Sequence, residues 1–195
     1  MGGTFNPIHI GHLLLAENAR ENFELDEVLF IPSGCSYMKD KKEVAKKEIR
    51  LEMTKLAIED NPFFVLSSIE AEREGNSYTY ETLEFLTKQQ PDTEFFFLLG
   101  ADSLFTMETW KHPEIIFRKC TLLAAVRDDK DNSDLARKIA ELKTTYDAVI
   151  YQISLKEISI SSTDIRNRIK NNKSIRYMVP EPVISYIREN HLYQN

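Results

Sequence analysis

The sequence predicts an α/β fold in which a parallel sheet is covered by helices on both faces. Two observations support this prediction. Short apolar runs alternate with segments of helical period along the chain. The apolar runs are nearly continuous, which is typical of strands buried on both faces of a parallel sheet. We expect residues 1–195 to form a single domain, because 195 residues can enclose one sizeable core.

The predicted strands are apolar runs, and two of them end at a residue that interrupts regular structure. The run EVLFIP ends at Pro32, and the run EFFFLLG ends at Gly100. In chain order, the predicted strands span residues 27–32, 63–68, 94–100, 120–126 and 147–154. Ligands of parallel α/β sheets bind at the carboxyl ends of the strands, so we expect functional residues there.

The predicted helices have apolar residues three and four positions apart. In residues 46–60, for example, one helical face contains Ile49, Met53, Leu56 and Ala57. In chain order, the predicted helices span residues 12–23, 46–60, 78–89, 133–146, 161–172 and 180–190. No strand is expected between the last two, so the chain is predicted to finish in a helical segment.

Composition and charge exclude several classes of protein. The net charge of −6 argues against a protein that coats nucleic acid, because such proteins neutralise phosphates with basic residues. No apolar run approaches the roughly 20 residues of a membrane span, and the N-terminus has no secretory pattern. Cys35 and Cys120 are expected to be free thiols in a reducing compartment. We therefore expect a cytoplasmic protein that binds neither nucleic acid nor membrane, and a homo-oligomer is compatible with the sequence.

The opening segment MGGTFNPIHIGH contains three of the six glycines and two of the four histidines of the chain. Gly2 and Gly3 are expected to take positive φ and to let the backbone approach a ligand, at a turn whose N–H groups predict an anion site. His9 and His12 are expected on one helical face, where they can donate hydrogen bonds to phosphate. Gly11 between them is expected to leave room for the ligand. The alternatives are two water-exposed histidines and a zinc site, for which no third ligand lies nearby in the sequence.

A second polar segment, ISSTDIR at residues 160–166, has the features of a helix start. Ser161 and Asp164 have the spacing of a capping box. Ser161, Ser162 and Thr163 place hydroxyl and N–H groups at the positive end of the predicted helix, and Arg166 adds a planar fork that suits phosphate. The alternative is a well-capped helix without a ligand.

These motifs resemble those of a known superfamily. GGTFNPIHIGH is similar to the T/H-x-G-H signature of nucleotidyltransferases, and ISSTDIR is similar to the ISSTxxR stretch that holds the triphosphate there. Three further stretches narrow the resemblance to bacterial nicotinate-nucleotide adenylyltransferases: SYTYETL (77–83), LLGADSL (98–104) with ETWKHPE (108–114), and VPEPVISYIRENHLY (179–193). The resemblance covers nearly the whole chain and implies a Rossmann-like nucleotidyltransferase fold.

The resemblance also implies an activity. Enzymes of this family transfer the adenylyl group of ATP to nicotinate mononucleotide in NAD synthesis, and release nicotinate adenine dinucleotide and pyrophosphate. It implies a Mg²⁺ ion that is held mainly by the ATP phosphates and water, with no metal ligand from the protein.

The resemblance assigns site residues to three groups. The catalytic group contains His9, His12 and Arg166. The ATP-binding group contains Gly3, Thr4, Phe5, Gly11, Gly100, Asp102, Ser161, Ser162 and Thr163. The group that binds nicotinate mononucleotide contains Lys39, Tyr78, Thr79 and Trp110. An aromatic face suits a flat electron-poor ring, and backbone N–H groups suit a carboxylate.

The chain departs from the family pattern at two places. The family has a basic P-P-H-K loop after IPSG, whereas this chain has CSYMK, so only Lys39 carries over. The family also has an apolar strand of about five residues before the glycines. Only Met1 precedes them here, so we expect the functional protein to have a short apolar segment upstream of Gly2.

Two other functions stay open as alternatives. Pantetheine-phosphate adenylyltransferase shares the first and last motifs, but the S-Y-T and G-A-D…W segments argue against it. A non-catalytic nucleotide-binding domain could lose His12 or Arg166, and both are present. The lysine-rich stretch 38–48 is interpreted as a solvated loop and helix start, or as a loop in which Lys39, Lys41 and Lys42 can contact a phosphate.

Overall fold

The structure is a computed structural model that describes residues 1–34, 44–127, 133–155 and 159–194. The backbone divides into two compact units. We call Gly2–Asn76 with Ile158–Asn195 the terminal unit, and Ser77–Glu157, to which Met1 is added, the middle unit. Each unit is described by itself, and the expected single domain stays a prediction.

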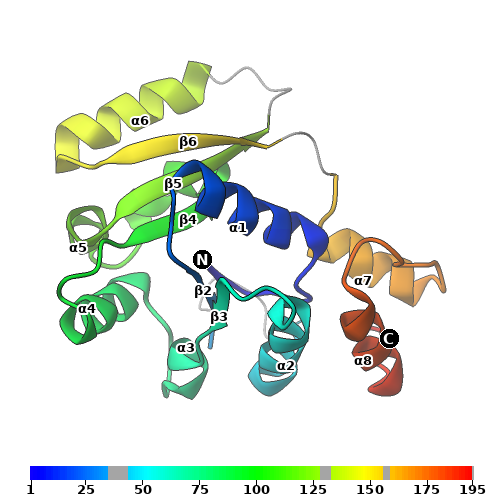
Figure 1. Cartoon of the computed structure of the whole chain (residues 1–195). Helices are drawn as coiled ribbons and strands as arrows, with labels where there is room; N and C mark the ends of the chain where they lie inside the picture. Colours follow the sequence, from blue (N-terminus) through cyan, green and yellow to red (C-terminus); the bar gives the residue numbers. More distant parts are fainter. Residues whose placement is uncertain (35–43, 128–132, 156–158, 195) are drawn as a thin grey trace. The chain divides into compact units, whose positions relative to one another are not determined.

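The terminal unit contains a three-stranded parallel sheet with the order β1-β2-β3 (Figure 1). Its strands are β1 (Gly2–Gly3), β2 (Val28–Pro32) and β3 (Phe64–Leu66). Gly2 pairs with Ile31, and Val28 pairs with Phe64. The helices of this unit are α1 (Ile10–Asn22), α2 (Lys47–Ile58), α3 (Ile69–Glu72), α7 (Ser162–Lys170) and α8 (Glu181–Glu189). α1 connects β1 to β2 and α2 connects β2 to β3, as in a repeated strand–helix–strand unit.

Aromatic packing fixes the centre of this unit. Phe30 of β2 is fully buried. Its ring lies 5.0 Å from the ring of Phe64 on β3 and 6.0 Å from the ring of Phe5, which precedes α1. The segment before α1 is therefore packed directly against the sheet.

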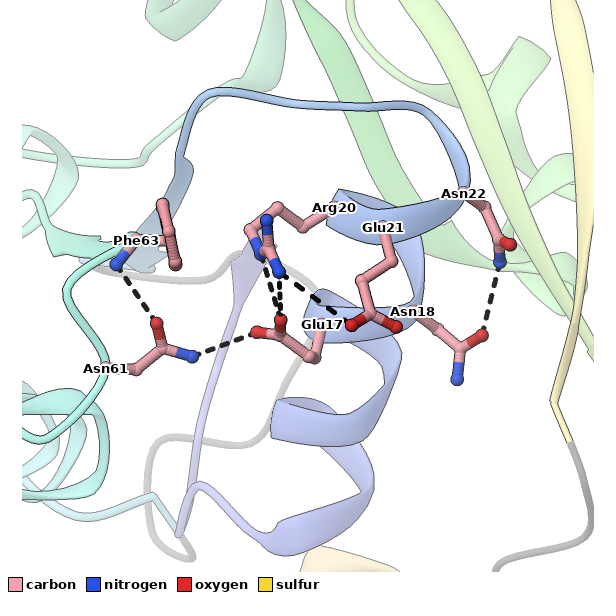
Figure 2. Close-up of polar contacts among 7 residues, drawn as sticks. All are labelled: Glu17, Asn18, Arg20, Glu21, Asn22, Asn61 and Phe63. Carbon is pink, nitrogen blue, oxygen red and sulfur yellow. Dashed lines mark hydrogen bonds and ion pairs between the residues drawn. The ribbon is translucent and has the colours of Figure 1, made fainter.

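A polar network joins the end of α1 to the turn after α2 (Figure 2). Arg20 Nη2 donates to Glu17 Oε1 at 2.6 Å, and Asn61 Nδ2 donates to Glu17 Oε2 at 2.9 Å. The Arg20 guanidinium also lies 4.3 Å above the ring of Phe63. The hydrogen bond from Arg20 lowers the pKa of Glu17, so this carboxylate stays ionised in the network.

One face of α2 differs from the prediction. Met53 and Ala57 are buried as expected, whereas Ile49 and Leu56 are only half-buried. Arg50 is buried instead, with 2% of its surface exposed. A long charged side chain is almost never buried without partners, so Arg50 has a specific structural role, described below.

The middle unit contains a second three-stranded parallel sheet, with the order β4-β5-β6. Its strands are β4 (Phe96–Gly100), β5 (Thr121–Arg127) and β6 (Ile150–Leu155). Phe96 pairs with Thr121, and Leu122 pairs with Ile150. The helical elements are α4 (Thr79–Gln89), the 3₁₀ turns η1 (Ala101–Phe105) and η2 (Met107–Thr109), α5 (Pro113–Lys119) and α6 (Ser133–Tyr146). β5 is the central strand of this sheet.

The core of the middle unit is apolar. Leu122, Ala124 and Leu142 are fully buried in it. Cys120 is a buried free thiol, as expected, and burial raises its pKa to about 12. Cys35 lies outside the described residues.

The predicted strands and helices are confirmed, with bounds that shift by at most three residues. The sequence reasoning missed the short elements β1, α3, η1 and η2, and the helix α5. A signal for α5 was present, because Pro113 occupies the first turn of this helix. In the part of the chain that the structure describes, no helix is long and apolar enough to cross a membrane.

Candidate active site

The opening segment MGGTFNPIHIGH (residues 1–12), called the glycine segment from here on, has a backbone that differs from the predicted one. Gly2 and Gly3 are extended and pair with Ile31 and Pro32 of β2, so the expectation of positive φ was wrong for both. Gly3 is required for a different reason. A Cβ on Gly3 would lie 2.8 Å from Cε1 of Phe5, which is closer than Cβ atoms approach such neighbours in proteins.

The turn is made instead by Phe5, whose φ is 47°. A left-handed backbone costs a non-glycine residue about 1–3 kcal/mol. Phe5 is buried, with its ring against Phe30 and edge-on to His12 at 5.1 Å. Burial of the aromatic ring offsets the cost of the turn and places a wall beside His12.

The two histidines lie together, as predicted. Their rings stack with centroids 3.6 Å apart and planes 25° apart. The main-chain N–H of His9 donates to Nδ1 of His12 at 3.2 Å. This bond requires an unprotonated Nδ1, so the neutral His12 ring has its proton on Nε2.

His9 is buried, with 7% of its surface exposed, which excludes a pair of water-exposed histidines. Burial lowers the pKa of His9 from 6.5 to about 4, so the ring is neutral at physiological pH. Its Nδ1 is buried without a hydrogen-bond partner among the described residues. Within the same residues, no group of three or more histidine, cysteine or acidic side chains could hold a metal ion, so nothing supports the zinc alternative.

Gly11 accommodates the ring of His9. A Cβ on Gly11 would lie 3.1 Å from Nδ1 of His9. The space that was expected to admit a ligand is therefore occupied by the histidine ring. An alanine at this position would press on that ring and disturb the stack with His12.

The start of α7 confirms the predicted cap. Ser161 is the N-cap residue, and its Oγ accepts a hydrogen bond from the N–H of Asp164 at 3.1 Å. Ser162 Oγ donates to the main-chain oxygen of Pro7 at 2.8 Å. The hydroxyl proton of Ser162 therefore binds the glycine segment, which leaves its oxygen lone pairs for other contacts.

Arg166, one turn into α7, also binds the glycine segment. Its Nη1 donates to the main-chain oxygen of Asn6 at 3.0 Å, and its Nη2 is 3.4 Å from Oγ1 of Thr163. Arg166 is half-buried, and Thr163 is exposed. Arg166 and Asn6 are 160 positions apart in the sequence, and their hydrogen bond joins α7 to the glycine segment that contains His9 and His12.

The buried Arg50 was missed by the sequence reasoning. Its guanidinium donates four hydrogen bonds to main-chain oxygens, at distances of 2.6 to 3.0 Å. The acceptors are Thr4, Ser33, Gly34 and Ala45. Arg50 thus joins the glycine segment to both sides of residues 35–43. The only signal in the sequence was its position on the predicted buried face of α2.

The candidate residues of the middle unit lie at the carboxyl end of β4 and near α4. Gly100 ends β4, and Asp102 is exposed in η1 immediately after it. A Cβ on Gly100 would meet no atom within 4 Å, so the described structure does not require a glycine there. Tyr78 is the N-cap residue of α4, and Thr79 is its first residue.

Two aromatic contacts shape this region of the middle unit. Trp110 packs edge-on against Phe97 at 6.3 Å, and its Nε1 is buried without a hydrogen-bond partner among the described residues. Lys111 Nζ lies 4.4 Å above the ring of Tyr78. The region therefore combines aromatic faces with a nearby cation.

Sequence comparisons identify the family. The model of the cytidylyltransferase-like family matches residues 1–168. A protein of Lachnoclostridium phytofermentans, named "Probable nicotinate-nucleotide adenylyltransferase", is 49% identical over 193 residues, which are 99% of this chain and 96% of that protein. A protein of Moorella thermoacetica with the same name is 43% identical over 195 residues, which are 100% of this chain and 90% of that protein. This chain belongs to the nicotinate-nucleotide adenylyltransferase family.

A solved structure supports the fold of this adenylyltransferase. The Plasmodium falciparum nicotinic acid mononucleotide adenylyltransferase complexed with NaAD matches 98% of this chain and 94% of its own, with a TM-score of 0.80 and 20% identity. At this identity the likeness concerns the fold alone. The Rossmann-like nucleotidyltransferase fold that the sequence predicted is therefore confirmed.

The predicted site residues that the structure describes are divided between the two units. The terminal unit unites Gly3, Thr4, Phe5, His9, Gly11, His12, Ser161, Ser162, Thr163 and Arg166 around the start of α1. The middle unit contains Tyr78, Thr79, Gly100, Asp102 and Trp110. Lys39 lies outside the described residues. The ligand that each group binds stays a prediction.

Proposed function

We propose that this chain transfers the adenylyl group of ATP to nicotinate mononucleotide in NAD synthesis, with nicotinate adenine dinucleotide and pyrophosphate as products. The observation that supports this most is the near-full-length identity of 40–49% to relatives with that name. The stacked His9–His12 pair beside the Arg166 contact gives the chain the polar groups that such a transfer needs.

In this reaction, an oxygen of the 5′-phosphate of nicotinate mononucleotide attacks the α-phosphorus of ATP in line. The bond between that phosphorus and the bridging oxygen of pyrophosphate breaks. The nucleophile is already an anion at neutral pH, so the site needs no general base. Positioning and stabilisation of negative charge account for catalysis in reactions of this kind.

We assign the charge stabilisation to His12 and Arg166. The neutral His12 ring has a proton on Nε2, because Nδ1 accepts from the His9 main chain. It can therefore donate to a phosphate oxygen without first gaining a proton. Arg166 adds a permanently charged fork, with Nη1 already oriented by the Asn6 oxygen.

His9 has a supporting part in this proposal. Its low pKa keeps the ring neutral, and stacking at 3.6 Å fixes the plane of His12. We also assign His9 to the alignment of the ATP phosphates. The hydroxyls of Ser161 and Thr163 complete the proposed phosphate site.

The described residues fit a Mg²⁺ ion whose ligands are ATP phosphates and water. No group of three or more histidine, cysteine or acidic side chains is present in the described part of the chain to form a protein cage. Mg²⁺ keeps several waters and often binds through substrate phosphates, so this donor set suits it. When bound, the ion would neutralise phosphate charge.

The middle unit supplies the proposed contacts to the nucleosides. Asp102, exposed after β4, suits the hydroxyls of a ribose, as carboxylates after parallel strands do in nucleotide folds. Gly100 leaves open space for the nucleotide. Trp110 offers a face for the pyridine ring, and the main chain around Thr79 offers donors for its carboxylate. Lys39 is proposed as a further phosphate contact.

Turnover of ATP with different acceptors tests this proposal. The purified chain is incubated with Mg-ATP and nicotinate mononucleotide, nicotinamide mononucleotide or phosphopantetheine, and the dinucleotide or coenzyme product is measured. We expect the fastest turnover with nicotinate mononucleotide. Turnover only with phosphopantetheine would favour the pantetheine-phosphate enzyme, and ATP binding without any turnover would favour a non-catalytic domain. We place the reaction in the cytoplasm, without nucleic-acid or membrane partners, and sedimentation would show whether a homo-oligomer forms.

A further inference from the structure

Asn6 is a junction for three distant segments of the terminal unit, two of which bind its side chain and one its main-chain oxygen. Asn6 is buried, with 4% of its surface exposed. Its Oδ1 accepts hydrogen bonds from the hydroxyl of Tyr193 at 2.8 Å and from the N–H of Ala45 at 3.0 Å. Its main-chain oxygen accepts from Nη1 of Arg166 at 3.0 Å. Any shift of this residue therefore moves the acceptor that orients Arg166.

The backbone around Tyr193 is shaped to make its contact. After α8, His191 and Tyr193 have φ of 50° and 62°, in the left-handed region. The N–H of Leu192 donates to the main-chain oxygen of Ile187 at 3.0 Å, which secures the segment to the end of α8. Left-handed conformations at non-glycine residues persist only where the surroundings impose them. The segment 190–194 is therefore held in one conformation by the α8 end and by Asn6.

Tyr193 acts as a hydrogen-bond donor in this arrangement. Burial raises its pKa above the usual range, while the nearby charges of Arg166 and Arg50 act in the opposite direction. The phenol consequently stays protonated at neutral pH.

We propose that Tyr193 is a positioning residue of the adenylyl-transfer site, which orients Arg166 through the side chain of Asn6. This inference rests on the proposed function and adds a residue to it. The Tyr193 hydroxyl fixes the Asn6 amide, and the fixed Asn6 backbone in turn presents its oxygen to Arg166. The guanidinium of Arg166 is then oriented before the triphosphate binds, so no free energy is spent on orienting it during the reaction.

The test compares the Tyr193→Phe substitution in two backgrounds, the natural chain and an Arg166→Ala variant. In the natural background we expect kcat to fall about fivefold, the effect of one typical hydrogen bond, with little change in the KM for nicotinate mononucleotide. We also expect ATP affinity, measured by titration calorimetry, to weaken about threefold. In the Arg166→Ala background both effects should shrink to less than about twofold, because the two residues act as one unit.

The matched control is Tyr177→Phe, which removes the same hydroxyl from a tyrosine of the terminal unit that is 84% exposed. It should leave kcat, ATP affinity and the melting temperature unchanged. Equal factors in both backgrounds would mean that Tyr193 has only a structural role, and an unchanged kcat and ATP affinity in the natural background would also overturn the proposal. The calorimetric comparison stands without turnover. If the unsubstituted protein made no dinucleotide, the proposed function would be contradicted. The ATP affinities of the variants would still show whether Tyr193 acts through Arg166.

Discussion

In the terminal unit, the segment before α1 is bonded to residues that lie 39, 160 and 187 positions away from Asn6: Ala45, Arg166 and Tyr193. In the middle unit, the aromatic candidates contact rings that are nearer in the sequence. The ring centroids of Tyr78 and Tyr80 are 6.1 Å apart, and those of Trp110 and Phe97 are 6.3 Å apart. Hydrogen bonds between distant segments distinguish the first group, and contacts between rings nearby in the sequence distinguish the second.

This difference suits the two kinds of ligand that we propose for the two groups. Charge that develops on a phosphate is stabilised only by donors that already point at it, so directional bonds between distant segments are appropriate there. A flat ring requires a face at the correct height, and aromatic packing provides one without a directional network. Substitutions in the terminal unit should accordingly lower kcat or stability, whereas those in the middle unit should change KM.

The largest effect is expected from His12→Ala. It removes the Nε2–H donor proposed for the α-phosphate, and kcat should fall about 100- to 1000-fold, the scale of one lost oxyanion donor. ATP binding, measured by calorimetry, should weaken much less. His12→Asn retains an N–H donor and should lose less activity than the alanine variant. A raised KM with an unchanged kcat would leave His12 as a ground-state contact only.

The second effect concerns stability. Arg50→Met leaves the main-chain oxygens of Thr4, Ser33, Gly34 and Ala45 without their guanidinium donor, so the free energy of unfolding should fall by about 3 kcal/mol. The measurement is denaturant unfolding.

The matched control for Arg50→Met is Arg137→Met in the middle unit, where the arginine side chain is 80% exposed. This control should change the unfolding free energy by less than about 0.5 kcal/mol. Similar losses in the two variants would contradict the role given to the buried guanidinium.

The third effect is a pH dependence from His9, whose pKa is about 4 in the folded chain and 6.5 in the unfolded chain. Between these values the unfolded chain binds a proton that the folded chain does not, so stability falls as the pH decreases through this range. Between pH 7 and pH 5 the unfolding free energy should drop by about 2 kcal/mol from this group. His9→Gln should remove that part of the slope, and an identical slope in both proteins would show that His9 does not cause it.

The smallest effect is expected from Trp110→Ala in the middle unit. Loss of the stacked indole should raise the KM for nicotinate and nicotinamide mononucleotides together, by about fivefold to tenfold.

The unsubstituted protein should prefer nicotinate mononucleotide over the amide at least roughly tenfold in kcat/KM, because an amide presents an NH₂ group to N–H donors. The Trp110 variant should keep that ratio, and a changed ratio would show that the indole contributes to reading the carboxylate.

The fold was largely predictable because the spacing of apolar residues along the sequence distinguishes strands from helices. The run EVLFIP became β2, and SDLARKIAELKTTY became α6 with the bounds predicted. The paired histidines and the Ser161 cap were also visible, since both depend on residues three positions apart.

The partners of Arg50 and Asn6 were not predictable. Their hydrogen bonds go to main-chain atoms or to residues far along the chain, and neither leaves a pattern in a single sequence. The positive φ expected at Gly2 and Gly3 failed for a related reason. The need for a small residue at Gly3 comes from the ring of Phe5, a contact that depends on the folded turn.

The 187 positions between Asn6 and Tyr193 have a consequence for the order in which the protein is made. Ribosomes synthesise proteins from the N-terminus at about 5–20 residues per second, and the parts made first can begin to fold first. Asn6 is synthesised before Tyr193, so one of its hydrogen-bond partners is added about ten seconds or more later at that rate. A nascent chain that lacks Tyr193 should therefore have an incompletely fixed Asn6, and the full nucleotide affinity that we propose should appear only after Tyr193 has been added.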